Sequence, residues 1–290
     1  MEEHPVHPIA LEGFWREHFP ALSIHSRLAG GDAPRMPVAA AQVARWRERI
    51  VEEGFFREAT DVLRERVPRL ADGVRTCRTL GLPPPFLFLF DETWEAFHAL
   101  DPMLQVLLGE DYRILPDFWT WHLDPASNES GWEPHRDRGR GALGPGGAPV
   151  SLTVWIALTE STPENGCIYV LPANRDPTYG TPREDQPDID VTKVRALPAA
   201  PGEFLCWNQA VLHWGGQASR FAGAARISMA LEFQSGRHPP FNTPLLPRLA
   251  NIPFAVRLRL VAKQLLQYTH VSPLTPEVTM LARDLLATPA

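Results

Sequence analysis

The chain has 290 residues, 44% of them hydrophobic, which is enough to bury the core of one large domain or a core with an appended subdomain. Its 28 basic and 34 acidic residues give a formal net charge of −6, which argues against nucleic acid as the main partner because phosphate binding favours a positive surface. The three cysteines, Cys77, Cys167 and Cys206, form no C-x-x-C pattern, and this predicts reduced thiols and a cytoplasmic location.

The start of the chain predicts no secretion signal. It begins Met-Glu-Glu-His-Pro, without the basic and apolar regions of a signal peptide. No apolar run approaches the length of a membrane-spanning helix. We expect a single domain over residues 1–290, with a mostly helical part at 1–110, a β-rich core at 111–235 and a helical extension at 236–290.

A helical pattern follows an irregular start at residues 1–37. Within 39–67, apolar side chains recur at the spacing of one helix face, and Gly54 is expected to divide this stretch into two helices. The apolar positions are Val43, Trp46 and Ile50.

The next segment predicts a connector and then another helix. Residues 82–90 include three consecutive prolines and are expected to be extended. Asp91 is expected to be the N-cap of a helix whose apolar residues follow at helical intervals. These apolar residues are Trp94, Phe97, Leu100 and Leu104.

Short strand-like runs bounded by Pro, Gly or Asn replace the helical pattern after Tyr112. Asn165-Gly166 predicts a tight turn, because these residues tolerate positive φ. These runs do not alternate with helices as in a βαβ fold. They therefore predict a β-barrel or a double-sheet jelly roll with flanking helices. They cover 118–123, the segment around residue 135, 151–158, 167–171 (the strand returning from the turn), 203–213 and 224–233.

The run 151–158 alternates cleanly between two faces of a strand. Leu152, Val154, Ile156 and Leu158 share one face, and Ser151, Thr153, Trp155 and Ala157 share the other.

The motif His135-x-Asp137 places an imidazole and a carboxylate two residues apart. On a strand, these two side chains point to the same face and can reach one metal ion. An isolated H-x-D is commonly a surface pair in a loop, so the interpretation depends on its context. His213, at the end of the run 203–213, is the best candidate for a third ligand. Two histidines and one carboxylate form the facial triad of non-haem Fe(II) oxygenases, which leaves metal positions open for a 2-oxo acid and O₂.

Arg226 begins the last predicted strand, which we expect to form a hairpin with the strand that ends at His213. Arg226 and Ser228 share its inner face. A guanidinium inside a barrel needs an anion, because an unpaired buried charge costs several kcal/mol. A cosubstrate carboxylate meets this need, and an internal salt bridge to Asp or Glu is the alternative. The outward face, expected to pack on helices, carries Ile227, Met229, Leu231 and Phe233.

These motifs resemble the phytanoyl-CoA dioxygenase family of Fe(II)/2-oxoglutarate oxygenases, and the similarity covers residues 40–235. One departure is Pro172-Ala173-Asn174-Arg175, where the family usually has Pro-Gly-Ser-His, and this leaves the rim of the substrate site undefined. The order and spacing of the following residues carry the resemblance: His135-x-Asp137, Val154-Trp155-Ile156-Ala157-Leu158, Glu164-Asn165-Gly166-Cys167, Leu171-Pro172, Gly202-Glu203, His213 and Arg226-x-Ser228.

The resemblance implies a double-stranded β-helix core with an iron site formed by His135, Asp137 and His213. The implied reaction is hydroxylation of an aliphatic carbon of a small or carrier-linked metabolite, with O₂ consumed and 2-oxoglutarate converted to succinate and CO₂. Desaturation, cyclisation and epimerisation use the same residues and stay open. Halogenation is disfavoured, because Asp137 fills the position that halogenases of this type leave for chloride.

The resemblance also implies that Arg226 and Ser228 bind 2-oxoglutarate and that Trp155 lines the cosubstrate pocket. Thr153 shares the inward face of Trp155, and we assign it to the same pocket. Two other classes of protein are alternatives. A zinc hydrolase would need a positioned general base, which the sequence lacks. A jelly-roll binding module without turnover is the other, and the intact ligand set and Arg226 argue against it.

Two features bear on the substrate. The Gly-rich segment 138–149 after the metal ligands predicts either a lid or a plain mobile connector. Several tryptophans lie near the metal-bearing strands and belong either to the core or to a substrate site. They are Trp119, Trp121, Trp132, Trp207 and Trp214.

The last helix is predicted from residue 254 to about 268. A basic amphipathic helix can lie on an anionic membrane, but packing of its stripe on the jelly roll is the more ordinary arrangement. We therefore expect a small-molecule substrate, keep membrane contact through 254–268 as the alternative and make no prediction of oligomeric state. The stripe is Phe254, Leu258, Val261 and Leu265, and the polar remainder is Arg257, Arg259, Lys263, Gln264 and Gln267.

Overall fold

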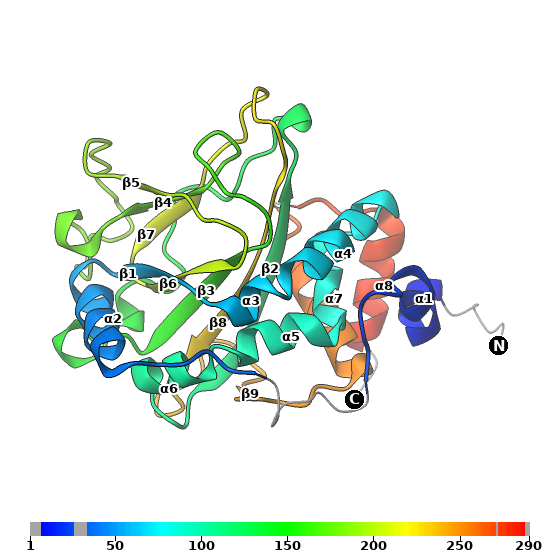
Figure 1. Cartoon of the computed structure of the whole chain (residues 1–290), viewed down its shortest axis with the longest axis horizontal. Helices are drawn as coiled ribbons and strands as arrows, with labels where there is room; N and C mark the ends of the chain where they lie inside the picture. Colours follow the sequence, from blue (N-terminus) through cyan, green and yellow to red (C-terminus); the bar gives the residue numbers. More distant parts are fainter. Residues whose placement is uncertain (1–6, 26–33, 271, 288–290) are drawn as a thin grey trace.

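The computed structural model describes residues 7–25, 34–270 and 272–287. Within them, strands form two antiparallel sheets (Figure 1), with the order β1-β6-β3-β8-β2-β9 in the larger and β5-β4-β7 in the smaller. The strands are β1 (Phe55–Ala59), β2 (Arg113–Leu123), β3 (Ser151–Ala157), β4 (Ile168–Leu171), β5 (Arg195–Leu197), β6 (Glu203–Asn208), β7 (Leu212–Gly215), β8 (Arg226–Gln234) and β9 (Leu246–Pro247).

Helices cover the outer face of the larger sheet, where α4, α5 and α7 lie against β2 and β8 (Figure 1). The α-helices are α1 (Glu12–His18), α2 (Ala40–Glu52), α3 (Asp61–Arg64), α4 (Val67–Thr79), α5 (Asp91–His98), α6 (Asp101–Leu108), α7 (Phe254–Gln267) and α8 (Pro276–Ala287). The 3₁₀ helices are η1 (Pro8–Ala10), η2 (Pro84–Leu89), η3 (Pro125–Ser127), η4 (Gly139–Ala142), η5 (Pro145–Gly147) and η6 (Ala173–Arg175).

The predicted alternation of the central strands is confirmed. On β3, Leu152, Val154 and Ile156 belong to the core beneath the helices, whereas Trp155 and Ala157 belong to a second core between the two sheets. The outward residues predicted for β8 likewise lie in the helix-facing core: Ile227, Met229, Leu231 and Phe233. The sheet therefore separates a structural face, which binds the helices, from an inner face, which is free to form a site.

One strand in the N-terminal half was not predicted. We had expected Gly54 to separate two helices. The prediction is wrong for the start of the second helix, because residues 55–59 form β1 and pair with β6. Gly54 turns the chain with a φ of +86°, and Phe55 and Phe56 are buried on opposite faces of the sheet. The pairing partner lies far away in the sequence, so the local pattern could not reveal it.

The segment around the three prolines also differs. Residues 82–90 are not extended throughout, since η2 occupies Pro84–Leu89 and its first prolines supply the fixed φ of a helical first turn. Asp91 is the first residue of α5, and Phe90 holds the N-cap position. The single helix expected after Asp91 is divided into α5 and α6, with Pro102 in the first turn of α6.

The strands also differ from the prediction in three places. The run 203–213 forms β6 and β7, which lie in different sheets and are separated by a turn at Gln209–Val211. Strand β8 pairs with β2 and β3 instead of forming a hairpin with β7. Residues 167–171 turn back at Gly166, as predicted, but β4 pairs with β5 and β7. These chain crossings between the two sheets distinguish a jelly roll from a β-meander.

The predicted apolar stripe of α7 is packed inward, with Leu258, Val261 and Leu265 at most 3% exposed. The predicted polar face is wrong in two positions. Arg257 is fully buried in an ion pair with Asp91, and Gln264 is fully buried. In residues 7–25, 34–270 and 272–287, no helix has both the length and the apolar character needed to cross a membrane.

Candidate active site

We had expected the segment that carries His135 and Asp137 to be a strand. It is not a regular strand, but it lies directly beside β7. The backbones of His135 and His213 exchange two N–H···O hydrogen bonds of 3.0 Å. Gly131 and Gly215 approach so closely that a Cβ on Gly131 would lie 2.4 Å from the Cα of Gly215. This contact brings the first and third predicted ligands together.

The three predicted ligand side chains converge. The Asp137 Oδ1 atom lies 3.4 Å from His135 Nε2 and 3.6 Å from His213 Nε2. One ligand atom from each residue lies within 4.8 Å of the others. Two imidazole nitrogens and a carboxylate oxygen are the donor set of a facial triad, so the residues present fit one iron ion.

Hydrogen bonds orient each side chain for this role. The Nδ1 atom of His135 lies 2.7 Å from the carbonyl of Glu133, and that of His213 lies 3.1 Å from the carbonyl of Val211. A carbonyl only accepts, so each Nδ1 carries the proton and each Nε2 lone pair is directed at the site.

Asp137 is held on the oxygen that faces away from the histidines. Its Oδ2 atom accepts hydrogen bonds from the Thr153 hydroxyl at 2.7 Å and from the Trp207 indole N–H at 3.0 Å. The hydroxyl of Thr153 in turn accepts from Gln209 at 3.0 Å. Oδ1 is left for a metal, which favours a single bond from this carboxylate.

The pKa shifts of Asp137 and His213 favour the protonation states that bind a metal. Burial lowers the pKa of His213 to about 4, although Asp137 opposes this shift. Burial opposes ionisation of Asp137, but the charges of His213 and His135 outweigh it and hold its pKa below the usual range. Burial also disfavours the charged form of His135, yet the bond to Asp137 raises its pKa overall. At neutral pH the site therefore holds a carboxylate beside a neutral His213.

Arg136, which lies between the two ligands of the H-x-D motif, anchors their segment. Its Nη2 is 2.6 Å from Asp176 Oδ2, and its Nη1 donates to the carbonyl of Ala210 at 2.7 Å. This role was not predicted from the sequence.

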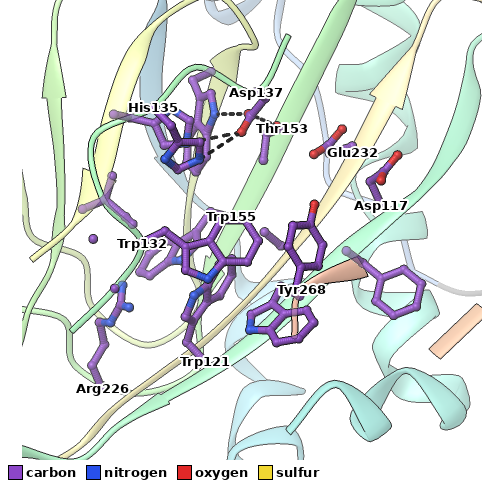
Figure 2. A pocket seen from close by; sticks show the side chains of 18 residues that line it. Asp117, Trp121, Trp132, His135, Asp137, Thr153, Trp155, Arg226, Glu232 and Tyr268 are labelled. Carbon is purple, nitrogen blue, oxygen red and sulfur yellow. Dashed lines mark hydrogen bonds and ion pairs between the residues drawn. The ribbon is translucent and has the colours of Figure 1, made fainter. Parts of the chain in front are cut away.

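Arg226 lies in the cavity that adjoins the triad (Figure 2), and Ser228 follows it on the same face of β8. Arg226 is 1% exposed, and its Nε and Nη1 atoms have no hydrogen-bond partner in the described part of the chain. Burial lowers its pKa to about 10, with Cys167 opposing the shift. The Ser228 hydroxyl is also buried without a partner. These orphaned donors fit a carboxylate ligand.

Aromatic residues contribute to the remaining wall, including Trp155, whose ring centroid lies 5.7 Å from the Arg226 guanidinium carbon. Trp119, Trp121, Trp132 and Trp207 line the cavity as well. Trp214 does not, because it stacks on Tyr169. The tryptophans near the metal-bearing strands thus divide into four that line the cavity and one that packs elsewhere.

An acidic wall was missed at the sequence level. Asp117 and Glu232 line the cavity, and Arg138 Nη2 lies 2.9 Å from a carboxylate oxygen of each. Strand alternation was a usable signal, since Glu232 follows Arg226 and Ser228 on the same face of β8. Tyr268, just past α7, closes the cavity beside these acids.

The Gly-rich segment 138–149 contains η4 and η5 and is pinned at both ends. The backbone N–H groups of Arg138 and Gly139 donate to the carbonyl of Gln209 at 2.9 and 3.0 Å, and Leu143 forms a bridge with Pro149. Its role as a lid stays a prediction.

A jelly roll that gathers two imidazoles and one carboxylate beside a cavity with a free buried arginine defines the class of mononuclear non-haem iron oxygenases that use a 2-oxo acid. The family model for phytanoyl-CoA dioxygenase (PhyH) matches residues 34–222. The chain therefore belongs to the phytanoyl-CoA dioxygenase family. It is an enzyme with Fe(II) and 2-oxoglutarate as its cofactors, as the resemblance in its motifs implied.

Solved structures support the same fold. The chain is similar to ThoJ, a non-haem monooxygenase, with a TM-score of 0.55, 16% identity and coverage of 83% of this chain and 99% of that one. It is similar to the epimerase SnoN, solved with Fe³⁺, α-ketoglutarate and nogalamycin RO, with a TM-score of 0.50, 15% identity and coverage of 72% and 96%. EctD from S. alaskensis gives a TM-score of 0.50, 16% identity and coverage of 77% and 90%.

Proposed function

We propose that the protein hydroxylates an aliphatic carbon of a small or carrier-linked metabolite. In this proposal, His135, Asp137 and His213 bind Fe(II), while Arg226 and Ser228 bind the distal carboxylate of 2-oxoglutarate. The observation that carries it is Arg226, a buried guanidinium without a carboxylate partner in the described chain, in the same cavity as the three converging ligand atoms.

Each residue near the iron has a defined task in this proposal. The bound Fe(II), with 2-oxoglutarate and O₂, supplies the oxidising chemistry. His135 and His213 present their Nε2 atoms, and Asp137 presents Oδ1 because Thr153 and Trp207 occupy Oδ2. Thr153 thus positions the carboxylate as well as lining the cosubstrate cavity.

Three residues handle the cosubstrate away from the metal. Arg226 matches a carboxylate with two parallel donors, which fixes the direction in which the cosubstrate enters. Ser228 adds a third donor, and Trp155 covers the cavity with an apolar ring that excludes water. Because 2-oxoglutarate would occupy this side, the substrate is left with the side lined by Trp132 and Tyr268.

We also propose that the described chain is one domain. Residues of the N-terminal helices, the larger sheet and α7 share a single hydrophobic core, which includes Trp15, Phe86, Leu231 and Leu258. The helices would then support the larger sheet from behind and leave its inner face for chemistry.

The substrate is proposed to arrive as a soluble or carrier-linked molecule rather than as a membrane lipid. The apolar stripe of α7 is buried, and Arg257 is held by Asp91, so neither is available to a bilayer. Vesicle flotation with anionic lipids tests this. Tight binding that is lost when Arg259 and Lys263 are neutralised would favour a membrane-borne substrate instead.

The central test measures iron and succinate together. Purified protein loaded with Fe(II) is expected to release succinate from 2-oxoglutarate, and His135→Ala and His213→Ala are expected to lose iron while keeping their circular dichroism. His18→Ala is a matched control, because His18 lies on α1, far from the cavity in sequence and packed on Phe14. Full iron occupancy in either triad variant would exclude that ligand.

Product analysis then decides the reaction type. Incubation with a metabolite extract is expected to yield a product heavier by one oxygen atom. Loss of two hydrogens would indicate desaturation or cyclisation, and an unchanged mass with altered stereochemistry would indicate the epimerisation named for SnoN.

A further inference from the structure

We infer that the primary substrate carries a cationic nitrogen, an amine or ammonium group, which binds between Asp117, Glu232 and a set of aromatic rings. This inference rests on the proposed function, because it treats the side of the cavity away from Arg226 as the substrate side. Figure 2 shows Asp117 and Glu232 on the opposite side of the cavity from Arg226, with Tyr268 between.

Strand β8 sets the distance between the two sides. Arg226, Ser228, Ala230 and Glu232 follow one another on its inner face, and six residues of strand span about 20 Å. Glu232 is paired across the sheet with Thr153, the residue that holds Asp137. Glu232 therefore lies level with the proposed iron site, where the reacting part of a substrate must be placed.

This side of the cavity has more carboxyl groups than cations. Asp117 is 1% and Glu232 13% exposed at the side chain, and both carboxyl groups share the single guanidinium of Arg138. Lys263 also interacts electrostatically with Asp117, but it donates to Asn242 and does not line the cavity. Two acids with one arginine leave a site that favours a positive ligand.

The environment of Glu232 points in the same direction. Burial raises the pKa of this side chain well above its ordinary value, Arg138 opposes the shift, and Asp137 and Asp117 add to it. A cation placed against the carboxyl group would stabilise its ionised form. An anionic substrate would disfavour ionisation of Glu232 further, and a neutral apolar one would give this carboxyl group no additional counter-ion.

Aromatic rings complete the subsite. Trp132 lies 4.6 Å from Tyr268 and Trp119 lies 5.2 Å from it, both measured between ring centroids. All three rings line the same cavity as the two acids. The face of an aromatic ring attracts a cation by about 0.5–2 kcal/mol, and such rings are a common way to bind ammonium groups. Carboxylates and ring faces together select for positive charge and against negative charge.

The test compares a cation with its neutral isostere. Choline and 3,3-dimethylbutan-1-ol have the same shape, and calorimetry would measure each against the full chain loaded with Fe(II) and 2-oxoglutarate without O₂. Choline is expected to bind at least about tenfold more tightly, since 1.4 kcal/mol corresponds to a factor of ten. In Glu232→Gln the preference is expected to fall severalfold, whereas Glu160→Gln, which removes an exposed carboxylate, is expected to keep it.

The opposite results are equally clear. Equal affinities, no binding of choline, or tighter binding of 3,3-dimethylbutanoate would overturn the inference, and the last would assign Arg138 to an anionic substrate. The comparison in the wild-type protein does not depend on whether Glu232→Gln folds. Iron content and succinate release of the same preparation report separately on the proposed function.

Discussion

Arg226 and Arg257 are both almost completely buried, yet their surroundings differ. Arg257, on α7, lies 2.6 Å from Asp91 Oδ1 and donates to the carbonyls of Leu89 and Ile252. Arg226, at the start of β8, has no ion pair within the described residues, and two of its nitrogens lack a partner. A guanidinium that is neutralised within the chain holds the fold together. One that is not neutralised is available to a ligand.

The largest effect is expected at Arg257. Arg257→Met removes the fully buried cation that pairs with Asp91 and leaves this buried carboxylate with His25 as its remaining partner. The substitution is expected to lower the free energy of unfolding by about 3–5 kcal/mol. Urea denaturation followed by circular dichroism measures this loss. Arg183→Met, at an exposed position, is the matched control and should change stability little. An unfolding free energy equal to that of wild type would show that the ion pair does not hold the helices to the core.

Arg226→Met should give the reverse pattern. Replacement of an unpaired buried charge by an apolar side chain is expected to leave stability unchanged or to increase it. Affinity for 2-oxoglutarate is expected to fall about ten- to 150-fold, because hydrogen bonds to charged groups contribute about 1.5–3 kcal/mol. The Kd from calorimetry and the KM for succinate release measure the loss. Unchanged cosubstrate dependence with retained iron would mean that another residue binds the cosubstrate.

Ser228→Ala sharpens the comparison with a neutral group. The Ser228 hydroxyl is buried without a partner, so its removal costs the fold little. Affinity for 2-oxoglutarate is expected to fall about two- to tenfold, the effect of one ordinary hydrogen bond of about 0.5–1.5 kcal/mol. A loss as large as that of Arg226→Met would indicate that the serine positions the arginine instead of adding its own bond.

The sequence was most informative where a residue type limits the chemistry. His135, Asp137, His213 and Arg226 were predicted from their residue types and spacing, and the structure brings all four to one cavity. The alternation of β3 was also readable, because a strand buried on both faces still divides its residues between two cores.

Pairing between distant segments was not readable. Strand β1 lies between two helices and pairs with β6 about 150 residues later, so nothing local distinguishes Phe55–Ala59 from helix. The division of 203–213 into β6 and β7 depends on a turn without Gly or Pro. The roles of Asp117 and Arg138 could likewise not be predicted, because they depend on the pairing of β2 with β8.

The close contact of Gly131 with Gly215 has an entropic consequence for the metal. Bringing two distant chain segments together costs loop-closure entropy, and in many small metal sites the metal must offset this cost itself. Here the loop-closure cost is already offset when the jelly roll forms, because the backbones of His135 and His213 pair with each other. Iron then has only to displace water from ligands that are in place. We therefore expect its affinity to report the ligand bonds alone, with little dependence on the overall stability of the protein.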